Sequence, residues 1–340
     1  MTQVSRRSMM IGSAALAGIG LPGTALAQDA APTATIERID PALDALIAPD
    51  AKVEVVTDGF QWCEGPVWVG GSDGYLLASD PPKNIIYQWS PKAGRSVWLT
   101  PSGYQGTPSP RFREPGSNGL FLSYRSGRDG LVIADSGGRG ISAIDLKTKK
   151  KTVLADKFEG KRFNSPNDLC VSPLDGAIYF SDPPYGLAGV QQSPDREMDY
   201  TGVFRLGRDG KVTLLGKYGM PNGVGISPDG RYLYHTDSEA GWIVHTLDAN
   251  GRSVSEKPFI DRAAQGIQSK SGDSLKVDAA GNVWLSEKGI SIVTPQGRRL
   301  GTIRVTGPAA NCEIGADGYL YIAANHHVMR VKVKAKKLVA

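Results

Sequence analysis

Six polar residues of related chemistry recur along the 340-residue chain, each at the start of a short apolar run. Subtracting their numbers gives intervals of 54, 49, 55, 51 and 38 residues. Two are carboxylates and four are amides: Glu64, Asn118, Asn167, Asn222, Asp273 and Asn311. None of the six is a cysteine or a histidine, and oxygen donors suit Ca²⁺ or Mg²⁺ better than Zn²⁺ or Cu²⁺. The six residues are candidate ligands of a hard cation, provided that the fold brings them together.

The sequence around these residues repeats a common pattern. Each polar residue precedes a short apolar strand, a glycine-containing turn and a second β-rich run. Asp-Gly pairs such as Asp229-Gly230 and Asp317-Gly318 mark several of the turns, because glycine tolerates the positive φ that tight hairpins need. A period of about 40–50 residues is typical of propeller blades with four strands each. The sequence therefore predicts an all-β, six-bladed β-propeller.

The last repeat is short. It begins at Asn311, which leaves 29 residues before the C-terminus at residue 340, too few for four strands. We expect a strand near the N-terminus, over Val53–Thr57, to complete this blade and close the ring. Closure would remove the exposed edges of an open sheet. The alternative is a two-sheet sandwich whose turns recur by coincidence.

The innermost strand of every blade lines the central channel of a propeller. Residues at the same point of each repeat should therefore form one ring around the axis. Two acids in a partly buried tunnel repel each other and are costly to desolvate, so a cation is expected between them. Ca²⁺ is the predicted ion because it accepts six to eight oxygens at relaxed geometry, with Mg²⁺ or Zn²⁺ as alternatives. The competing interpretation is that the asparagines only cap strands and turns.

The N-terminus has the features of a secretory signal. A paired arginine, Arg6-Arg7, precedes a mild apolar run and the small-residue site Ala25-Leu26-Ala27. This order favours a twin-arginine signal peptide over residues 1–27. We expect residues 28–50 to be a leader or linker and residues 51–340 to be the propeller. The mature protein is predicted to be periplasmic, with only transient contact with the twin-arginine export machinery and no membrane anchor.

Composition narrows the remaining function classes. The net charge is only +5, and no cluster of Lys and Arg interleaved with aromatic residues occurs, so no nucleic-acid partner is expected. The three cysteines, Cys63, Cys170 and Cys312, form no C-x-x-C motif and are interpreted as small buried hydrophobic residues, with a Cys63–Cys312 disulfide as an alternative. The four histidines, His235, His245, His326 and His327, are expected in outer or terminal segments without a partnered serine, so a serine hydrolase is not indicated.

Four ordered motifs resemble the SMP-30/gluconolactonase family of six-bladed propellers, over about residues 53–333. One of them extends through the Asp-Pro-Pro-Tyr-Gly stretch at residues 182–186. The motifs are E-G-P-V-W (Glu64–Trp68), E-G-K-R-F-N-S-P-N-D-L (Glu159–Leu169) with Y-F-S-D-P-P-Y-G (Tyr179–Gly186), P-N-G-V-G-I-S-P-D-G (Pro221–Gly230) and G-D-S-L-K-V-D (Gly272–Asp278).

The resemblance implies one catalytic divalent cation held by Glu64, Asn222 and Asp273, with Asn167 contacting the metal or the substrate. It also implies hydrolysis of a sugar lactone. Many members carry His-Gly after the second-blade hairpin, where this chain has A-D-S-G-G-R-G at residues 134–140. Animal members often carry arginine where this chain has Ser165, and we expect nearby Arg162 to serve instead.

The predicted chemistry is the opening of a lactone by a cation-polarised carbonyl and an activated water. Asp273 is the candidate general base, while Asn118, Asn167 and Arg162 would orient hydroxyls or the developing oxyanion. Tyr185 is placed to stack on a sugar ring. Two other functions stay open: a non-catalytic propeller that binds a ligand or protein and is closed by calcium, and a hydrolase of other esters or phosphotriesters at the same site.

Overall fold

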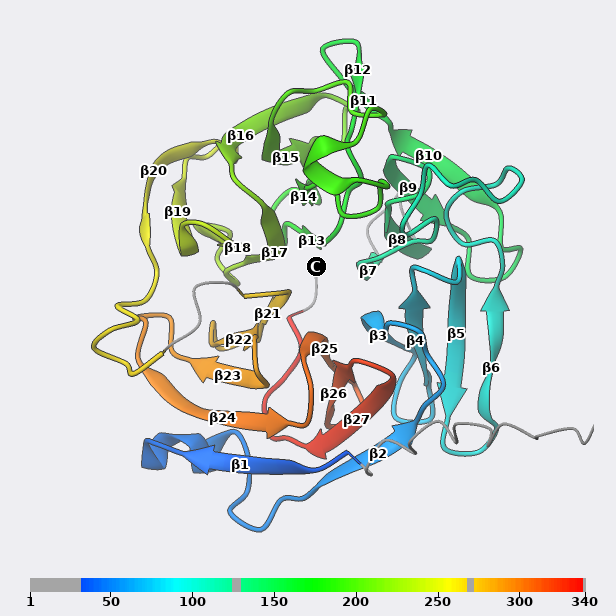
Figure 1. Cartoon of the computed structure of the whole chain (residues 1–340). Coiled ribbons are helices and arrows are strands. Elements are labelled where there is room, and N and C mark those ends of the chain that lie inside the picture. Colours follow the sequence, from blue (N-terminus) through cyan, green and yellow to red (C-terminus); the bar gives the residue numbers. More distant parts are fainter. Residues whose placement is uncertain (1–31, 124–129, 268–271, 339–340) are drawn as a thin grey trace, which may run out of the picture. The chain divides into compact units, whose positions relative to one another are not determined.

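A computed structural model describes residues 32–123, 130–267 and 272–338 of the chain. From Thr33 onward the chain forms one compact unit. Within this unit, six antiparallel sheets are arranged around a central axis, each with its first strand innermost (Figure 1). The prediction of an all-β, six-bladed propeller is confirmed. Neither described helix, each a short 3₁₀ turn, has the length and hydrophobicity of a membrane span.

The first three blades follow the chain from inside to outside. Blade 1 contains β3 (Glu64–Val69), β4 (Tyr75–Asp80), β5 (Ile85–Ser90) and β6 (Gly94–Leu99). Blade 2 contains β7 (Leu120–Ser123), β8 (Gly130–Asp135), β9 (Gly140–Ile144) and β10 (Lys151–Ala155). Blade 3 contains β13 (Leu169–Val171), β14 (Ile178–Asp182), β15 (Thr201–Leu206) and β16 (Val212–Tyr218). A small hairpin, β11 (Lys157–Phe158) and β12 (Lys161–Arg162), lies between blades 2 and 3 in the sequence.

The last three blades repeat this order, with additions from the N-terminal part of the chain. Blade 4 contains β17 (Pro221–Ile226), β18 (Tyr232–Asp237), β19 (Gly241–Leu247) and β20 (Ser253–Pro258). Blade 5 contains β21 (Leu275–Val277), β22 (Val283–Ser286), β23 (Ile290–Val293), β24 (Arg299–Val305) and β1 (Ala34–Arg38). Blade 6 contains β25 (Ala309–Ile314), β26 (Tyr319–Ala324), β27 (His327–Lys332) and β2 (Val53–Thr57).

The ring closes as the short last repeat predicted. Strand β2 pairs antiparallel with β27 as the outermost strand of blade 6. The inner strands β25 and β3 are also in contact, so the last blade packs against the first. Closure by an N-terminal strand joins segments at opposite ends of the sequence and leaves no inner strand without a neighbour.

Part of the segment that the sequence favoured as a leader or linker, residues 28–50, belongs to the propeller. Strand β1 pairs antiparallel with β24 and adds a fifth strand to blade 5. The following 3₁₀ helix η1 (Pro41–Ala45) is capped by the Asp40 carboxylate, which accepts a hydrogen bond from the backbone of Ala42. Leu43 and Ile47 are fully buried against blades 5 and 6, and this burial holds the segment in place.

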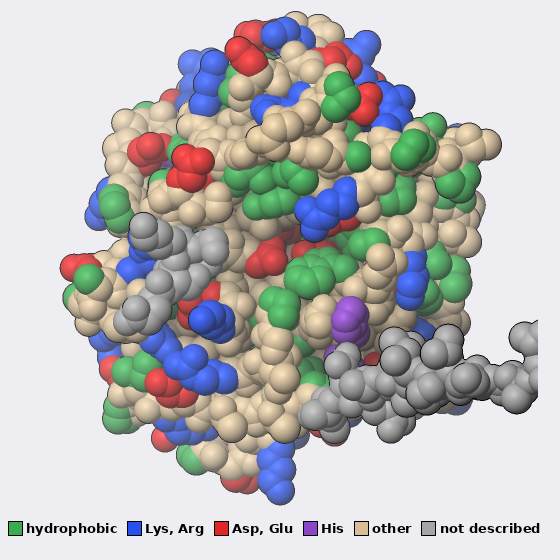
Figure 2. All heavy atoms as spheres, viewed as in Figure 1, with side chains coloured by type: hydrophobic (Ala, Val, Ile, Leu, Met, Phe, Trp, Pro, Cys, Tyr) green, Lys and Arg blue, Asp and Glu red, His purple; other side chains and the backbone are tan. Residues whose placement is uncertain are grey.

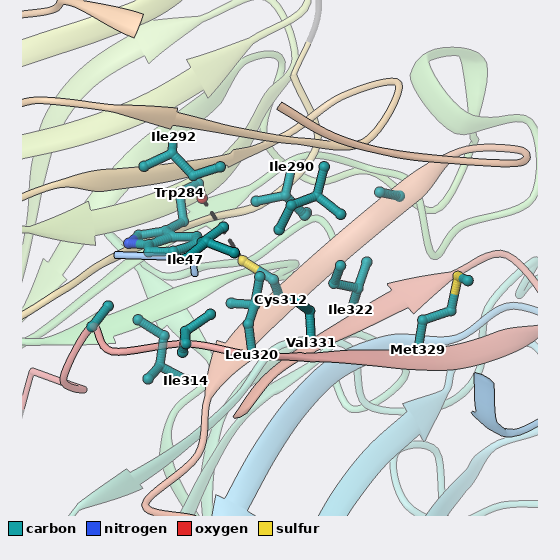
Figure 3. Packing of buried hydrophobic residues seen from close by; sticks show 14 of the residues in the cluster. Ile47, Trp284, Ile290, Ile292, Cys312, Ile314, Leu320, Ile322, Met329 and Val331 are labelled. Carbon is teal, nitrogen blue, oxygen red and sulfur yellow. Dashed lines mark hydrogen bonds between the residues drawn. The ribbon is translucent and has the colours of Figure 1, made fainter. Parts of the chain in front are cut away.

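Apolar side chains are buried in six clusters, one between each pair of adjacent blades. Figure 3 shows the cluster between blades 5 and 6, where Trp284 and Ile292 of blade 5 face Ile314 and Leu320 of blade 6. Burying a side chain of this size contributes about 1.5–3 kcal/mol. The arrangement fixes the spacing between inner strands, and this spacing determines how closely polar residues on neighbouring blades approach.

The three cysteines are buried and free. Cys312 lies in the cluster between blades 5 and 6, where its Sγ is 3.9 Å from the Trp284 carbonyl (Figure 3). Cys63 lies in a different cluster, between blades 6 and 1, with Trp68 and Tyr321. The interpretation of the cysteines as small buried hydrophobic residues is confirmed, and Cys63 and Cys312 do not pair.

Candidate metal centre and active site

The six repeated polar residues lie at or just before the inner strands of their blades. Glu64 is the first residue of β3, and Asp273 precedes β21 by two residues. Backbone hydrogen bonds between blades hold this part of the ring. The Gly119 N–H donates to the Asn167 carbonyl at 2.8 Å, and the Gly223 N–H donates to the Asp273 carbonyl at 3.1 Å. These bonds join blade 2 to blade 3 and blade 4 to blade 5, so the ring residues are positioned by main chain rather than by mobile loops.

Glycine follows three of the ring residues because neighbouring backbones approach too closely for a side chain. A Cβ on Gly65, whose φ is +45°, would lie 2.2 Å from the Asn118 carbonyl oxygen. A Cβ on Gly223 would lie 2.6 Å from the backbone nitrogen of Leu275. The Glu-Gly and Asn-Gly pairs in the sequence therefore indicate that the inner strands pack closely around the axis.

The ring opens into a pocket of about 390 Å³ in the middle of one face. Figure 2 shows acidic side chains in the hollow at the centre of this face, with cationic side chains near its edge. Six of the predicted site residues line the pocket: Glu64, Asn118, Asn167, Tyr185, Asn222 and Asp273. Asn311 is fully buried beside them, where its Nδ2 donates to Glu64 Oε2 at 3.3 Å.

Arg162 lies elsewhere. It is on β12, its Nη2 donates to the Gly138 carbonyl at 2.6 Å, and it lines a second cavity near blade 2. Its neighbour along the motif, Ser165, is buried and donates to the Pro183 carbonyl at 2.7 Å. The structure therefore does not bring Arg162 together with the other predicted site residues.

Burial and mutual repulsion dominate the electrostatics of the pocket. Burial raises the pKa of Glu64 to about 7, and Asp168 and Glu114 add to this increase. Burial and the nearby Glu64 charge also raise the pKa of Asp273 well above its ordinary value, while a hydrogen bond from Asn222 partly offsets the shift. Two carboxyls that disfavour each other's ionisation have a strong attraction for a shared cation.

Two amide oxygens in the same pocket lack a partner. The Oδ1 atoms of Asn118 and Asn222 are buried without a hydrogen bond, and both residues line the pocket. An unpaired buried carbonyl oxygen costs about 1–3 kcal/mol. Among the residues that the structure describes, no group of three or more His, Cys, Asp or Glu side chains is arranged to hold a metal. The donor set that fits a cation here is therefore mixed, with two carboxylates and amide oxygens, as Ca²⁺ accepts.

A buried ion pair lies next to the ring. Lys276 of β21 is 3.4 Å from Asp168, which directly follows Asn167. Asp168 also accepts a short hydrogen bond from the Ser274 hydroxyl. The lysine compensates the charge of the third buried acid near the axis, and Glu64 and Asp273 remain without a cationic partner among the described residues.

Several residues that line the pocket were not predicted from the sequence, among them Arg113 and Glu114. Glu114 is buried, its Oε1 lies 3.0 Å from Arg113 Nη2, and burial raises its pKa to about 7. Both backbone N–H groups donate to the Gly186 carbonyl. The two residues lie in the long connection between β6 and β7. This segment does not follow the repeat, so the position of these residues could not be predicted from the repeat. The only signal was a charged pair four residues before Asn118.

The sequence model of the protein family described as the SMP-30/gluconolactonase/LRE-like region matches residues 62–326 of this chain. These residues include strands of all six blades. This chain belongs to the SMP-30/gluconolactonase/LRE-like family. The matched region contains every residue of the ring.

Several proteins similar to this chain are lactonases by name. A gluconolactonase from Zymomonas mobilis is 41% identical over 88% of this chain and 86% of its own length. A pentonolactonase from Haloferax volcanii is 28% identical over 46% of this chain and 48% of its own length. The solved structure of a gluconolactonase from Xanthomonas campestris is 26% identical, covers 90% of this chain and 96% of its own, and has a TM-score of 0.74.

Proposed function

We propose that this protein is a lactone hydrolase that opens a sugar lactone with the help of one divalent cation. The expected cation is Ca²⁺. The observation that carries the proposal is the pairing of two desolvated carboxyls, Glu64 and Asp273, with the unpartnered Oδ1 atoms of two asparagines in one pocket. Its membership of a lactonase-containing family and its 41% identity with a gluconolactonase support the same reaction class.

Four residues would hold the cation: Glu64, Asn167, Asn222 and Asp273. All four line the pocket, and their side chains offer carboxylate and amide oxygens. A cation held by these residues would polarise the lactone carbonyl and offset the negative charge that develops on its oxygen. The raised pKa values of Glu64 and Asp273 support a site that is completed by positive charge.

A general base is needed as well, because Ca²⁺ acidifies water less than Zn²⁺ does. Asp273 is the first candidate, since it lines the pocket beside the other ligands. Glu114 is the second, because its pKa of about 7 is well matched to proton transfer at neutral pH. We assign proton removal from the attacking water to Asp273 and treat Glu114 as the alternative that experiment must separate.

The remaining pocket residues suit a polyhydroxylated ring. Asn118 presents an unpartnered amide oxygen to accept a hydrogen bond from a sugar hydroxyl. Burial raises the pKa of Tyr185 to about 12, so its hydroxyl stays protonated and can donate. Arg113 is half-exposed at the pocket and can donate to ring oxygens or to the opened carboxylate.

The test is a pH-stat assay of lactone opening on a panel of aldonolactones of five and six carbons, with simple aryl esters and a phosphotriester for comparison. Turnover of a sugar lactone should disappear with chelator and return with added Ca²⁺, with Mg²⁺ and Zn²⁺ as comparison ions. Asn222→Ala and Asp273→Asn should weaken calcium binding and lower turnover. Asn250→Ala, in an exposed turn, is the matched control and should behave as the wild type.

Each other outcome selects a different function. Calcium binding without turnover of any substrate would favour a non-catalytic propeller closed by its ion. Turnover of the aryl ester or phosphotriester in place of the lactones would favour a different hydrolase on the same site. Lactone turnover that is indifferent to chelator and to Asp273→Asn would remove the cation from the mechanism.

We also propose that the chain is exported to a periplasm through the twin-arginine route. The proposal rests on Arg6-Arg7 and on the Ala25-Leu26-Ala27 cleavage site, both of which lie outside the described residues. Replacing both arginines by lysine should keep the full-length protein in the cytoplasmic fraction. Equal amounts of processed protein in the periplasmic fraction of both strains would contradict the route.

A further inference from the structure

A second cavity, of about 220 Å³, lies beside blade 2 and is separate from the central pocket. Its lining contains four cationic side chains and one acid: Arg111, Arg139, Lys151, Arg162 and Asp135. The single acid is already engaged, because Asp135 accepts hydrogen bonds from Lys151, from the Gly138 N–H and from Ser142. The cavity therefore presents more cationic than anionic groups.

Two of the arginines have unsatisfied guanidinium atoms. Arg139 is 3% exposed, and its Nη2 is buried with no hydrogen-bond partner. The Nε of Arg162 is buried without a partner as well. A buried donor without a partner costs about 1–3 kcal/mol, and more when the group is charged. Two such atoms on two cations of one cavity indicate that a further acceptor completes the site.

The backbone of Arg139 is itself in an unusual conformation. Its φ is +59°, in the left-handed region that a long side chain rarely adopts. Its Nε donates to the carbonyls of Phe163 and Asn164 at 2.8 and 3.1 Å, which hold the guanidinium in a fixed orientation. The strained position lies in the Gly137–Gly140 turn, and it carries a guanidinium into the protein interior.

The acids around this cluster do not fully neutralise it. Glu197 lies 3.9 Å from Arg139 Nη1, beyond hydrogen-bond distance, and accepts from the backbone of Arg162. Asp195 is engaged with Arg111 at 2.5 Å. Burial and the neighbouring Arg162 charge lower the pKa of Arg139 from its ordinary value. An anion bound between the two guanidinium groups would reduce the repulsion between them.

We propose that this cavity is an anion site that binds a small molecule through a phosphate, sulfate or carboxylate group, held by Arg139 and Arg162. Guanidinium groups recognise such groups through paired N–H donors in a fixed plane. The cavity far exceeds the ~30 Å³ share of one water molecule, so it has room for an oxyanion and a few further atoms. Tyr104 and Phe112, whose rings lie 4.6 Å apart, offer an apolar wall for those atoms.

The site is independent of the proposed hydrolysis. The Arg111–Glu114 segment contributes Arg111 and Phe112 to this cavity and Arg113 and Glu114 to the central pocket. No ring residue lines the second cavity. Loss of the cation site should therefore leave anion binding intact.

Isothermal titration of the calcium-loaded protein with sulfate, acetate and gluconate tests the proposal, with chloride as the background anion. Sulfate stands for the tetrahedral group and the two carboxylates for the planar group. Saturable binding of at least one probe is expected, and Arg162→Gln should weaken it at least tenfold. Arg139→Gln should weaken binding to the same extent. If Arg139→Gln does not fold, Arg162→Gln alone tests the proposal. The backbone N–H of residue 162 still donates to Glu197 in that variant, so the fold should be retained. Arg304→Gln, which removes an exposed arginine on β24, is the control of equal charge change and should bind as the wild type.

Three results would overturn the proposal. The first is the absence of saturable binding for all three probes. The second is equal affinity in Arg162→Gln and in the control Arg304→Gln, which would mean that the anion responds only to overall charge. The third is the loss of binding in Asp273→Asn, which would place the anion on the cation of the central pocket.

Discussion

Lys276 Nζ lies 3.4 Å from Asp168 Oδ2, although the two residues are 108 positions apart in the sequence. The pair joins blade 5 to blade 3 beside the ring of metal-site candidates. Both side chains are almost fully buried. Removing one partner of a buried ion pair leaves an uncompensated charge, which is far more costly than removing both.

Lys276→Met should therefore lower the free energy of unfolding by about 3–5 kcal/mol. The double variant Lys276→Met/Asp168→Asn should recover a large part of this loss, because no unpaired charge remains. Urea titration of the calcium-loaded protein measures both. Equal stability of the single and double variants would mean that Asp168 is compensated by another group.

Calcium binding should release protons near neutral pH. The pKa of Glu64 is about 7 and that of Asp273 is raised, so at pH 7 the metal-free site holds protons that a bound cation displaces. Calorimetric titration with Ca²⁺ at pH 7, in two buffers of different ionisation enthalpy, measures the number released. The number should be smaller at pH 9, where these carboxyls are further ionised, and smaller in Glu64→Gln. A release that does not change with pH would contradict the shifts.

The two candidate general bases predict different kinetic results. Replacing the residue that removes the proton by its amide, Asn for Asp or Gln for Glu, should lower kcat/KM by about 10²–10⁴-fold. If Asp273 is the base, Asp273→Asn has this effect even at saturating calcium, and Glu114→Gln retains an acidic limb in its pH–rate profile. If Glu114 is the base, Glu114→Gln loses both the rate and the limb, with calcium affinity unchanged. Calcium affinity, measured alongside, separates loss of the ion from loss of the base.

A buried histidine pair in blade 4 should make stability depend on pH. His245 Nε2 lies 2.9 Å from His235 Nδ1, and Tyr218, Ser253 and Glu256 surround His245. Burial lowers the pKa of both histidines, and Glu256 partly offsets the shift at His245. The unfolded chain, with a histidine pKa of about 6.5, binds more protons below that pH. The free energy of unfolding is therefore largest above pH 6.5 and decreases as the pH falls below this value.

His245→Gln should therefore flatten the decline in unfolding free energy between pH 7.5 and pH 5, measured by urea titration. His327→Gln, at a half-buried position of β27, is the matched control and should keep the wild-type decline. A decline of the same steepness in His245→Gln would assign the acid sensitivity to other groups.

The features that repeat along the chain could be predicted from the residues alone. Six copies of one strand–turn–strand pattern imply six equivalent blades, because each unit must bury the same apolar faces against its neighbours. Equivalent positions then lie at equivalent distances from the axis, so Glu64, Asn222 and Asp273 could be assigned to one ring without coordinates. The shortness of the last repeat was enough to assign Val53–Thr57 to its outer edge, and the structure has β2 there.

The features that do not repeat depend on how distant segments of the chain pack together. Strand β1 joins blade 5 because Leu43 and Ile47 are buried between blades, a contact that no local pattern encodes. Arg162 and Arg113 both lie outside the repeats. Arg162, on β12, lines the second cavity, and Arg113, between β6 and β7, lines the central pocket. Their positions depend on packing between distant segments, whereas periodicity constrains only residues that share a register.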